Sequence, residues 1–267
     1  MSKKIIMFFK IIIYPALAIS SILITILSFY PLSNAILGLP WTLWIVLFCI
    51  LLLIIMNVSI FFNISIKFDK YRNVSIKKGD ILNSKNGIVI IPVNEYFDTI
   101  VDDKIVSSTS LHGKFIKEIF KDNVDKLNLE IEHSLAGIDY ENNEQRYNGN
   151  IKKYKIGTVA RIEYINNIYL LLACTHFNDE NTACIDLHEY YYSIIKLLDY
   201  IHSKHYDKDI YIPLIGGSGL NRLELNKIDT LINMISIINS YKKKLKITII
   251  IDKDLPIIDI LYIKYLF

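Results

Sequence analysis

The stretch DIYIPLIGGSGLNR, residues 209–222, places three of the chain's ten glycines around one serine, directly after a run typical of a buried strand. Glycines let the backbone approach a ligand closely and adopt positive φ angles, and Ser218 adds a hydroxyl donor. In an open α/β sheet, ligands gather at the carboxyl ends of the strands, where helix N-termini present free N–H groups to anions. The pattern therefore predicts a phosphate-binding loop, although it is neither a Walker A nor a G-x-G-x-x-G motif. A strand-to-helix turn without a ligand is the alternative.

Strand and helix patterns alternate around this loop from residue 64 onward, which is typical of an α/β fold. The predicted helices are 110–123, 184–205 and 223–241. The predicted strands are 64–68, 73–78, 87–93, 154–165, 168–176, 209–215 and 245–252, with 154–165 and 168–176 as neighbours. Several of these strands are rich in isoleucine and lack clean alternation, as strands covered on both faces do. We therefore expect a three-layer α/β/α domain with a mixed sheet.

The whole chain is 52% hydrophobic, and its N-terminal region is more apolar than the rest. Residues 11–30 and 41–62 are two runs without charge. At about 1.5 Å per residue, each is long enough to cross the roughly 30 Å hydrocarbon core of a bilayer. The loop between them is short, uncharged and bounded by prolines. We therefore predict a transmembrane helical hairpin at 1–63, followed by one domain at 64–267.

Positive charges flank the two runs and are absent from the loop between them; they are Lys3, Lys4, Lys10, Lys67, Lys70 and Arg72. Because such flanks stay on the cytoplasmic side of a membrane, both termini and the domain 64–267 are expected to be cytoplasmic. A signal peptide is the alternative for the first run. It would have a shorter apolar core and a small-residue cleavage site, and neither is present.

Charge, cysteine and histidine content argue against several classes of function. The net charge of +3 is too small to indicate nucleic-acid binding by itself. Cys49 lies inside the second apolar run, and Cys174 and Cys184 have no spacing typical of a metal site or a disulfide. No carboxylate or cysteine completes a ligand set with the six histidines. The sequence also shows no G-x-S-x-G elbow and no Cys–His pair. We therefore expect no metal, no nucleic-acid partner and free thiols.

A second clue lies in the stretch KKGDILNSKNGIVIIPVNEYFD, residues 77–98. Asp80 follows a glycine between two strands, and Asn94 directly follows a buried strand at the same end of the sheet as the glycine loop. An aspartate can accept from an exocyclic amine, and an asparagine can both donate to and accept from sugar hydroxyls. Each residue is ordinary in a turn by itself. Together with a phosphate loop, they provide three of the contacts that an adenine-ribose-phosphate ligand needs.

These motifs together resemble the successive signatures of a macro domain, the ADP-ribose-binding module. They are GDI at 79–81, IVIIPVN at 88–94 and IPLIGGSG at 212–219. The resemblance implies that Asp80, with Ile81 beside it, contacts adenine, and that Asn94 approaches the distal ribose. It also implies a loop that wraps the diphosphate, formed by Gly216, Gly217, Ser218, Gly219 and the following Leu220.

The stretch TSLHG, residues 109–113, departs from the pattern of active macro-domain hydrolases, which carry a glycine-rich loop at this place. Gly113 and the helix after it fit the pattern, but the flexible glycines that would admit a catalytic water are missing. Ser110 and His112 stand at the start of the helix, where an anion is favoured, and are expected to reach the ligand. We therefore expect binding without catalysis; a membrane-anchored ADP-ribosyl hydrolase is the alternative.

With the N-terminal hairpin, the chain resembles the membrane effectors of type II Thoeris antiphage defence. That resemblance implies a multi-pass protein of the bacterial inner membrane that binds an ADP-ribose-type signal, histidine-ADP-ribose, made from NAD by a TIR-domain partner. It implies that binding drives assembly into a homo-oligomer and damage to the lipid bilayer. No cofactor is expected besides this ligand. A structural anchor that docks another protein is a third possibility.

Overall fold

The computed structural model describes most of the chain from residue 72 onward. The described ranges are 63–67, 72–121, 123–177, 183–204, 208–216, 225–241, 243 and 245–251, with a few shorter stretches nearer the two ends. Most of the predicted glycine loop, residues 217–220, lies outside them. The chain divides into two compact units, residues 1–64 with 256–267, and residues 65–255. Each unit is described by itself.

The N-terminal unit contains a short reversal of the chain between the two apolar runs. Strand β1 (Ala35–Ile36) pairs antiparallel with β2 (Leu39–Pro40). The predicted spans 11–30 and 41–62 lie almost wholly outside the described residues. Among the residues that are described, no helix has the length and apolar character needed to cross a bilayer. The membrane hairpin therefore stays a prediction.

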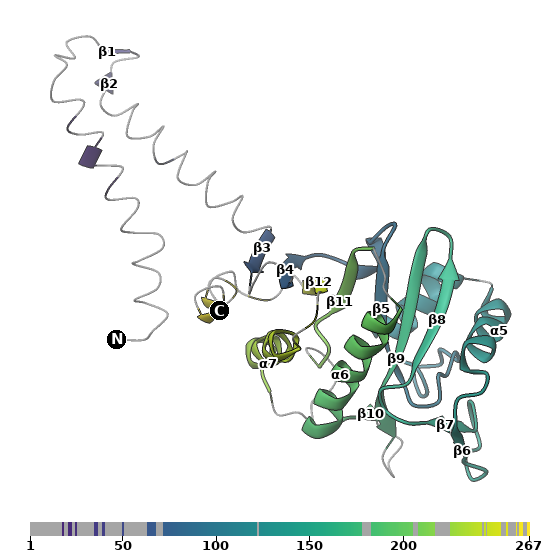
Figure 1. Cartoon of the computed structure of the whole chain (residues 1–267). Helices are drawn as coiled ribbons and strands as arrows, with labels where there is room; N and C mark the ends of the chain where they lie inside the picture. The colour runs from purple at the N-terminus through teal and green to yellow at the C-terminus, as the bar shows by residue number, and fades with distance from the viewer. Residues whose placement is uncertain are drawn as a thin grey trace. The chain divides into compact units, whose positions relative to one another are not determined.

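The second unit is built on a mixed sheet (Figure 1). Its strands are β3 (Asn63–Lys67), β4 (Arg72–Lys78), β5 (Ile88–Asn94), β8 (Val159–Tyr164), β9 (Asn167–Phe177), β10 (Ala183–Cys184), β11 (Ile210–Pro213) and β12 (Leu245–Ile251). They follow the order β10-β9-β5-β11-β12-β4-β3, with β8 also paired to β9. The pairings from β9 through β5, β11 and β12 to β4 are parallel, and β8 and β10 are antiparallel to β9. The sheet is therefore mixed, as predicted.

The helices described in this unit are the 3-10 turn η2 (Ile81–Asn83), α4 (Leu111–Lys114) with the π-helix η3 (Phe115–Phe120), α5 (Val124–Leu135), α6 (Leu187–Ser203) and α7 (Lys227–Ser240). A small antiparallel pair, β6 (Tyr140–Asn142) and β7 (Lys152–Tyr154), follows α5. Each strand predicted from residue 64 onward has a counterpart, but the predicted strand 154–165 is divided by a turn at 155–158 into the end of β7 and β8. The predicted helix 110–123 is instead a short α-helix that widens into a π-helix, and α5 was not assigned from the sequence.

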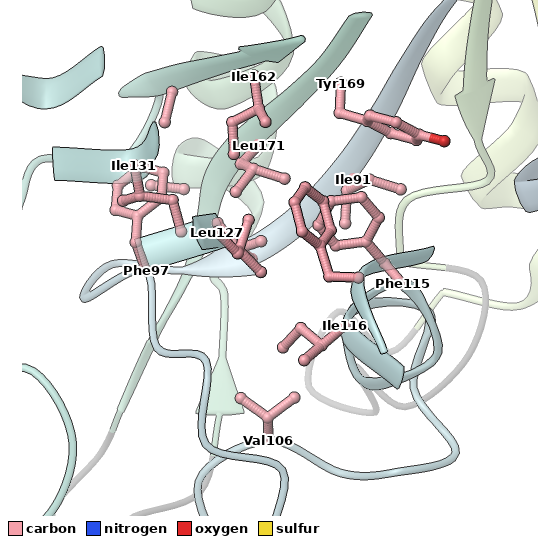
Figure 2. Close-up of a cluster of buried hydrophobic side chains, with 14 of the residues drawn as sticks. Ile91, Phe97, Val106, Phe115, Ile116, Leu127, Ile131, Ile162, Tyr169 and Leu171 are labelled. Carbon is pink, nitrogen blue, oxygen red and sulfur yellow. The ribbon is translucent and has the colours of Figure 1, made fainter. Parts of the chain in front are cut away.

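Helices cover both faces of the sheet (Figure 1). Successive side chains of a strand point to opposite faces, so the residues of β5 divide between two cores. Val89 and Ile91 join the cluster that Phe115 and its neighbours form on the side of α4 and α5 (Figure 2). Ile88 and Ile90 are equally buried on the other side, where α6 packs on β9 and against α7. The three-layer α/β/α arrangement is thereby confirmed.

The ladder between β5 and β11 stops early, and two prolines explain why. Ile88 donates to the carbonyl of Asp209 over 2.8 Å, so every second residue of β5 from Ile88 faces β11, including Pro92. Because Leu214 donates to β12, Pro213 faces β5 by the same alternation. Proline has no N–H to donate, and the recorded β5–β11 pairing ends at Tyr211 with Val89. The two strands therefore part at their carboxyl ends.

Candidate functional site: a crevice between two strand ends

A cavity of about 470 Å³ lies where β5 and β11 part. The chain leaves β5 toward α4 and α5 on one face, whereas β11 leads to α7 on the other. Adjacent strands whose connections leave on opposite faces form a crevice at their carboxyl ends, which is the usual ligand site of open α/β sheets. The volume falls within the range of ligand pockets. Its described lining residues are Pro92, Val93, Asn94, Ile105, Val106, Ser107, Thr109, Ser110, Leu111, His112, Cys174, Thr175, Phe177, Ala183, Pro213, Leu214, Ile215 and Gly216.

Asn94 lines this cavity from the end of β5, and its amide is largely engaged by its own loop. The side-chain oxygen accepts from the backbone N–H groups of Tyr96 (3.0 Å) and Asp98 (3.3 Å). The side-chain nitrogen donates to Asp98 Oδ2 over 3.0 Å. An asparagine that closes a turn in this way fixes the path of the chain. The second N–H of the amide is the group that Asn94 could offer to a ligand.

Asp98 is the buried centre of the loop that Asn94 begins. Arg146 pairs with its carboxylate over 2.7 and 3.1 Å, and the Asn150 backbone N–H donates to it over 2.8 Å. The guanidinium of Arg146 also stacks on the ring of Tyr96, 3.8 Å from its centroid. A buried charge is tolerated only when it is paired and hydrogen-bonded, and here both conditions are met. The segment between β6 and β7 thus holds Asp98, which in turn holds Asn94 at the cavity.

The loop between Asp98 and α4 is held by hydrogen bonds of its own. Asp102 accepts from the backbone N–H groups of Lys104 and Ile105, and Asp103 accepts from that of Ser108. These backbone hydrogen bonds lower the pKa of both exposed carboxyls. Two Asp-based turns therefore give this loop a defined shape beside the cavity.

Ser110 and Gly113 join this loop to the helix. Ser110 is the N-cap of α4: its hydroxyl accepts from the Gly113 N–H (3.0 Å) and donates to the carbonyl of Ser107 (2.7 Å). A Cβ on Gly113 would stand 2.1 Å from that same carbonyl oxygen, so only glycine fits there. Ser110 lines the cavity, whereas Gly113 is packed against the loop and does not line it.

His112 lies in the first turn of α4, lines the cavity and is buried. Burial lowers its pKa to about 4, because the charged imidazolium would lose its hydration. The side chain is therefore neutral at physiological pH. A neutral imidazole can donate from one nitrogen and accept at the other, which suits an uncharged partner such as a ribose hydroxyl.

Gly216 lies in the turn that follows β11 and is the last residue described before the rest of the glycine loop. It lines the cavity. Its φ of +84° lies in the left-handed region that favours glycine. The glycine-rich stretch therefore begins its turn at the cavity, as the sequence predicted. Gly217, Ser218, Gly219 and Leu220 lie outside the described residues, so their contacts with a diphosphate stay a prediction.

Asp80 and Ile81, like Gly113, are predicted site residues that do not line the described cavity. Asp80 follows β4 and caps η2, where Oδ1 accepts from the Leu82 N–H over 3.0 Å. Ile81 is buried in the core cluster with Phe115 and Ile116. Asp80 stands at the same edge of the sheet, since Gly79 donates to the last residue of β12. Its contact with adenine stays a prediction.

The sequence analysis missed the contribution of β9. Cys174, Thr175 and Phe177 line the cavity from the end of this strand, and Thr175 is a buried polar residue. The pairing shifts between Val93 and Asn94, because Val93 opposes Ala173 and Asn94 opposes Thr175. Such bulges are common next to active sites, where they redirect side chains. The position of this strand beside β5 was the signal that could have suggested these residues.

The structure also corrects one negative conclusion, because it brings together a cysteine and a histidine. Cys184 Sγ lies 3.1 Å from His176 Nε2, where β10 pairs with β9. Cys174 and Cys184 are both free. Among the described residues, no group of three or more His, Cys, Asp and Glu side chains is arranged to hold a metal ion.

Comparison with known proteins identifies the family of the domain that contains this crevice. The family described as "Thoeris protein ThsA, Macro domain" matches residues 74–254. The chain belongs to the macro-domain family of Thoeris ThsA proteins. The Thoeris protein ThsA of Bacillus amyloliquefaciens (strain Y2) is 34% identical over 152 residues, which are 56% of this chain and 50% of that protein. The chain thus spans about half the length of that ThsA relative.

Solved structures agree with a macro fold for this ThsA family member. The macrodomain of Oceanobacillus iheyensis with MES bound has a TM-score of 0.50 at 12% identity, over 76% of this chain and 96% of that one. A point mutant of the same macrodomain with ADPR has a TM-score of 0.51 at 11% identity, also over 76% and 96%. At such low identity, the likeness concerns the fold alone.

Proposed function

We propose that this chain is a sensor in antiphage defence, whose macro domain binds an ADP-ribose-type nucleotide. The observation that carries the proposal is the crevice between β5 and β11, where Asn94, His112 and Gly216 converge in a cavity of about 470 Å³. The fold neighbours support the ligand class, because two Oceanobacillus iheyensis macrodomain structures are described as being with ADPR and with ADP. Membership in the ThsA family supports the defence role.

The lining of the cavity suits a ligand held by dipoles. None of its described lining residues is charged at neutral pH, since His112 is neutral there. A diphosphate would be held by backbone N–H groups of the glycine turn and by hydroxyls, as helix N-termini and backbone nests hold anions. Ribose hydroxyls would meet the free N–H of Asn94 and the imidazole of His112.

The same lining supports sensing and not cleavage. General-base catalysis needs a group that takes a proton from water near neutral pH. No carboxylate is among the described lining residues, and His112 with a pKa of about 4 is a weak base. The loop that would admit a catalytic water is fixed instead by Ser110 and the close packing of Gly113. A membrane-anchored ADP-ribosyl hydrolase is the second candidate, favoured only by the shared fold.

In the proposed effector step, binding of the signal precedes damage to the membrane. A TIR-domain partner would make histidine-ADP-ribose, and binding would favour an assembled form in which the N-terminal hairpins disrupt the bilayer of the bacterial inner membrane. A ligand can drive such assembly only if it binds the assembled form more tightly than the free one. The two unbroken apolar runs, 11–30 and 41–62, support a membrane anchor.

Calorimetry of the purified full chain tests the ligand. ADP-ribose, histidine-ADP-ribose and ADP are titrated in turn, and the expected result is binding of an ADP-ribose derivative. Asn94→Ala and Gly217→Glu should abolish binding and toxicity to the host cell together. Toxicity that persists in a variant unable to bind the ADP-ribose derivative would contradict the sensing role. Release of ADP-ribose from a modified protein or from O-acetyl-ADP-ribose would support the hydrolase instead.

A further inference from the structure

Three side chains with complementary chemistry meet beside the crevice, in a group that the proposed nucleotide site does not use. Cys184 Sγ lies 3.1 Å from His176 Nε2, and His176 Nδ1 lies 2.9 Å from Glu189 Oε2. The three residues come from β10, β9 and the first turn of α6. A nucleophile next to a base, with the base held by a third group, is the arrangement that activates nucleophiles in enzymes.

Local structure fixes each member of this group. The antiparallel register sets Cys184 directly opposite His176. Glu189 belongs to the capping box of α6: its backbone N–H donates to Asp186 over 2.7 Å, and its carboxylate accepts from the Asp186 N–H over 3.4 Å. The carboxylate is therefore held at the helix start with one oxygen near the imidazole. The Glu189–His176 contact is at ion-pair distance, without hydrogen-bond alignment.

The arrangement places a proton acceptor beside the thiol. His176 Nε2 is close enough to take the thiol proton, and the imidazolium that forms would lie beside the Glu189 carboxylate. A thiolate is the reactive form of cysteine, and a neighbouring imidazolium stabilises it. Cys174 offers a comparison within the same protein, because burial raises the pKa of its thiol to about 12. One cysteine thus has a base beside it, and the other is kept protonated.

The exposure of Cys184 limits the size of the reagents that can reach it. Cys184 is only 5% exposed, so a bulky acyl or peptide substrate would not reach its sulfur. His176 and Glu189 are about one-third exposed and line a second cavity of about 690 Å³. The residue before Cys184, Ala183, lines the nucleotide crevice. The group thus borders the second cavity through His176 and Glu189, and the small exposure of Cys184 restricts its reagents to small molecules.

We propose that Cys184 is a peroxide-reactive thiol, with His176 as its proton acceptor and Glu189 as the positioning residue. In this step the thiolate attacks one oxygen of a hydroperoxide, an S–O bond forms and the O–O bond breaks. The sulfur is oxidised by two electrons to a sulfenic acid, and the peroxide is reduced. The leaving oxygen takes the proton held on His176, so hydrogen peroxide yields one water. The inference is independent of the ligand in the nucleotide crevice.

The test measures modification rates on the purified full chain by mass spectrometry, with hydrogen peroxide and iodoacetamide as probes. Native Cys184 should react roughly tenfold faster than the same cysteine in the urea-unfolded chain at equal pH, although burial alone would make it slower. Cys174 should stay nearly unmodified in the native chain. A Cys184 that reacts more slowly when native than when unfolded would overturn the proposal.

Two variants separate activation from folding. His176→Asn should slow Cys184 to the unfolded rate or below and remove the thiolate absorbance in the ultraviolet. Glu189→Gln retains a side chain that can complete the capping box but removes the charge, so it should lower the rate several-fold without changing the melting temperature. Unchanged rates and absorbance in both variants would show that the contact is only structural. Cys184→Ser should abolish the modified peptide.

Discussion

Asn94 Nδ2 donates to Asp98 Oδ2 over 3.0 Å, at the start of a loop that Arg146 closes from the other side. The residue expected to meet a ribose is therefore one member of a buried polar group, not a free side chain on a strand end. Variants of the crevice must be interpreted with this coupling in mind, because residues in one network do not contribute independently. The predictions that follow use the partners of this group and its neighbours.

Arg146→Met should destabilise the protein by about 3 kcal/mol, because it leaves the fully buried Asp98 carboxylate without its counter-ion. Methionine retains an apolar chain against Tyr96. Urea denaturation measures the change. Arg161→Met is the matched control, since Arg161 pairs with the exposed Glu163 and should cost less than about 1 kcal/mol. Equal losses in the two variants would contradict the structural role of the buried pair.

Stability should fall as the pH is lowered from about 6.5 toward 4, because of His112. Its pKa in the folded chain is about 4 against an ordinary 6.5, so the unfolded chain binds the extra proton throughout this window. The difference corresponds to roughly 3 kcal/mol. The measurement is a series of thermal melts of the wild type and His112→Gln between about pH 7 and about pH 4. This range covers both the ordinary pKa of histidine and the pKa of His112 in the folded chain. The variant should show a flatter profile.

His133 provides the control for that experiment. It is exposed in the last turn of α5, so His133→Gln should leave the steepness of the pH profile unchanged. A wild-type profile no steeper than that of His112→Gln would mean that His112 is not held neutral by burial.

Gly113→Ala should displace the loop beside the crevice, since its Cβ would stand 2.1 Å from the Ser107 carbonyl oxygen. We expect a loss of about 1–3 kcal/mol of stability and weaker nucleotide binding, the range for overpacking a filled site. Gly79→Ala is the matched control, because a Cβ there meets no atom within 4 Å. Calorimetric unfolding and ligand titration of both variants measure stability and affinity. Equal stability and affinity in the two variants would argue against close packing at Gly113.

Glu95→Gln should raise stability at neutral pH, or leave it unchanged. Burial raises the pKa of the Glu95 carboxyl despite the nearby Lys153, so its contribution is most favourable at low pH and declines as the pH rises through the folded value. Glutamine can still accept from the Phe177 N–H, the bond that Glu95 makes over 3.4 Å. Denaturation at pH values on both sides of the carboxyl's range provides the measurement. A marked loss at neutral pH would show that the Lys153 pair outweighs desolvation.

Much of the fold could be predicted from the sequence, because isoleucine-rich strands and amphipathic helices have clear periodic patterns. Helix α6 and strand β12 are examples, with apolar spacing that matches their burial. The π-helix could not be predicted, since its sequence FIKEIF fits an α-helix equally well. Asn94 lies at the end of β5, where the sequence placed it, but Arg146, which closes its loop, lies 48 residues beyond Asp98 and no local pattern joins them.

The site was predicted from residues that follow strands, and two of these residues, Asn94 and Gly216, line the cavity. It could not reveal Cys184 beside His176, because that contact depends on the register of a short antiparallel pair. Nor could it show that Ile81 belongs to the core. Strand ends identify where a site lies, whereas side-chain contacts decide which groups remain available to a ligand.

Pro92 and Pro213 make the opening of the sheet a permanent property of the backbone. Two ordinary residues at these positions could hydrogen-bond across the gap and close the strands into a continuous ladder, which a ligand would then have to break. Because neither proline carries an N–H, this competing ladder cannot form between them. The binding energy of any ligand in this crevice is therefore available for selectivity, because none of it is needed to separate the strands.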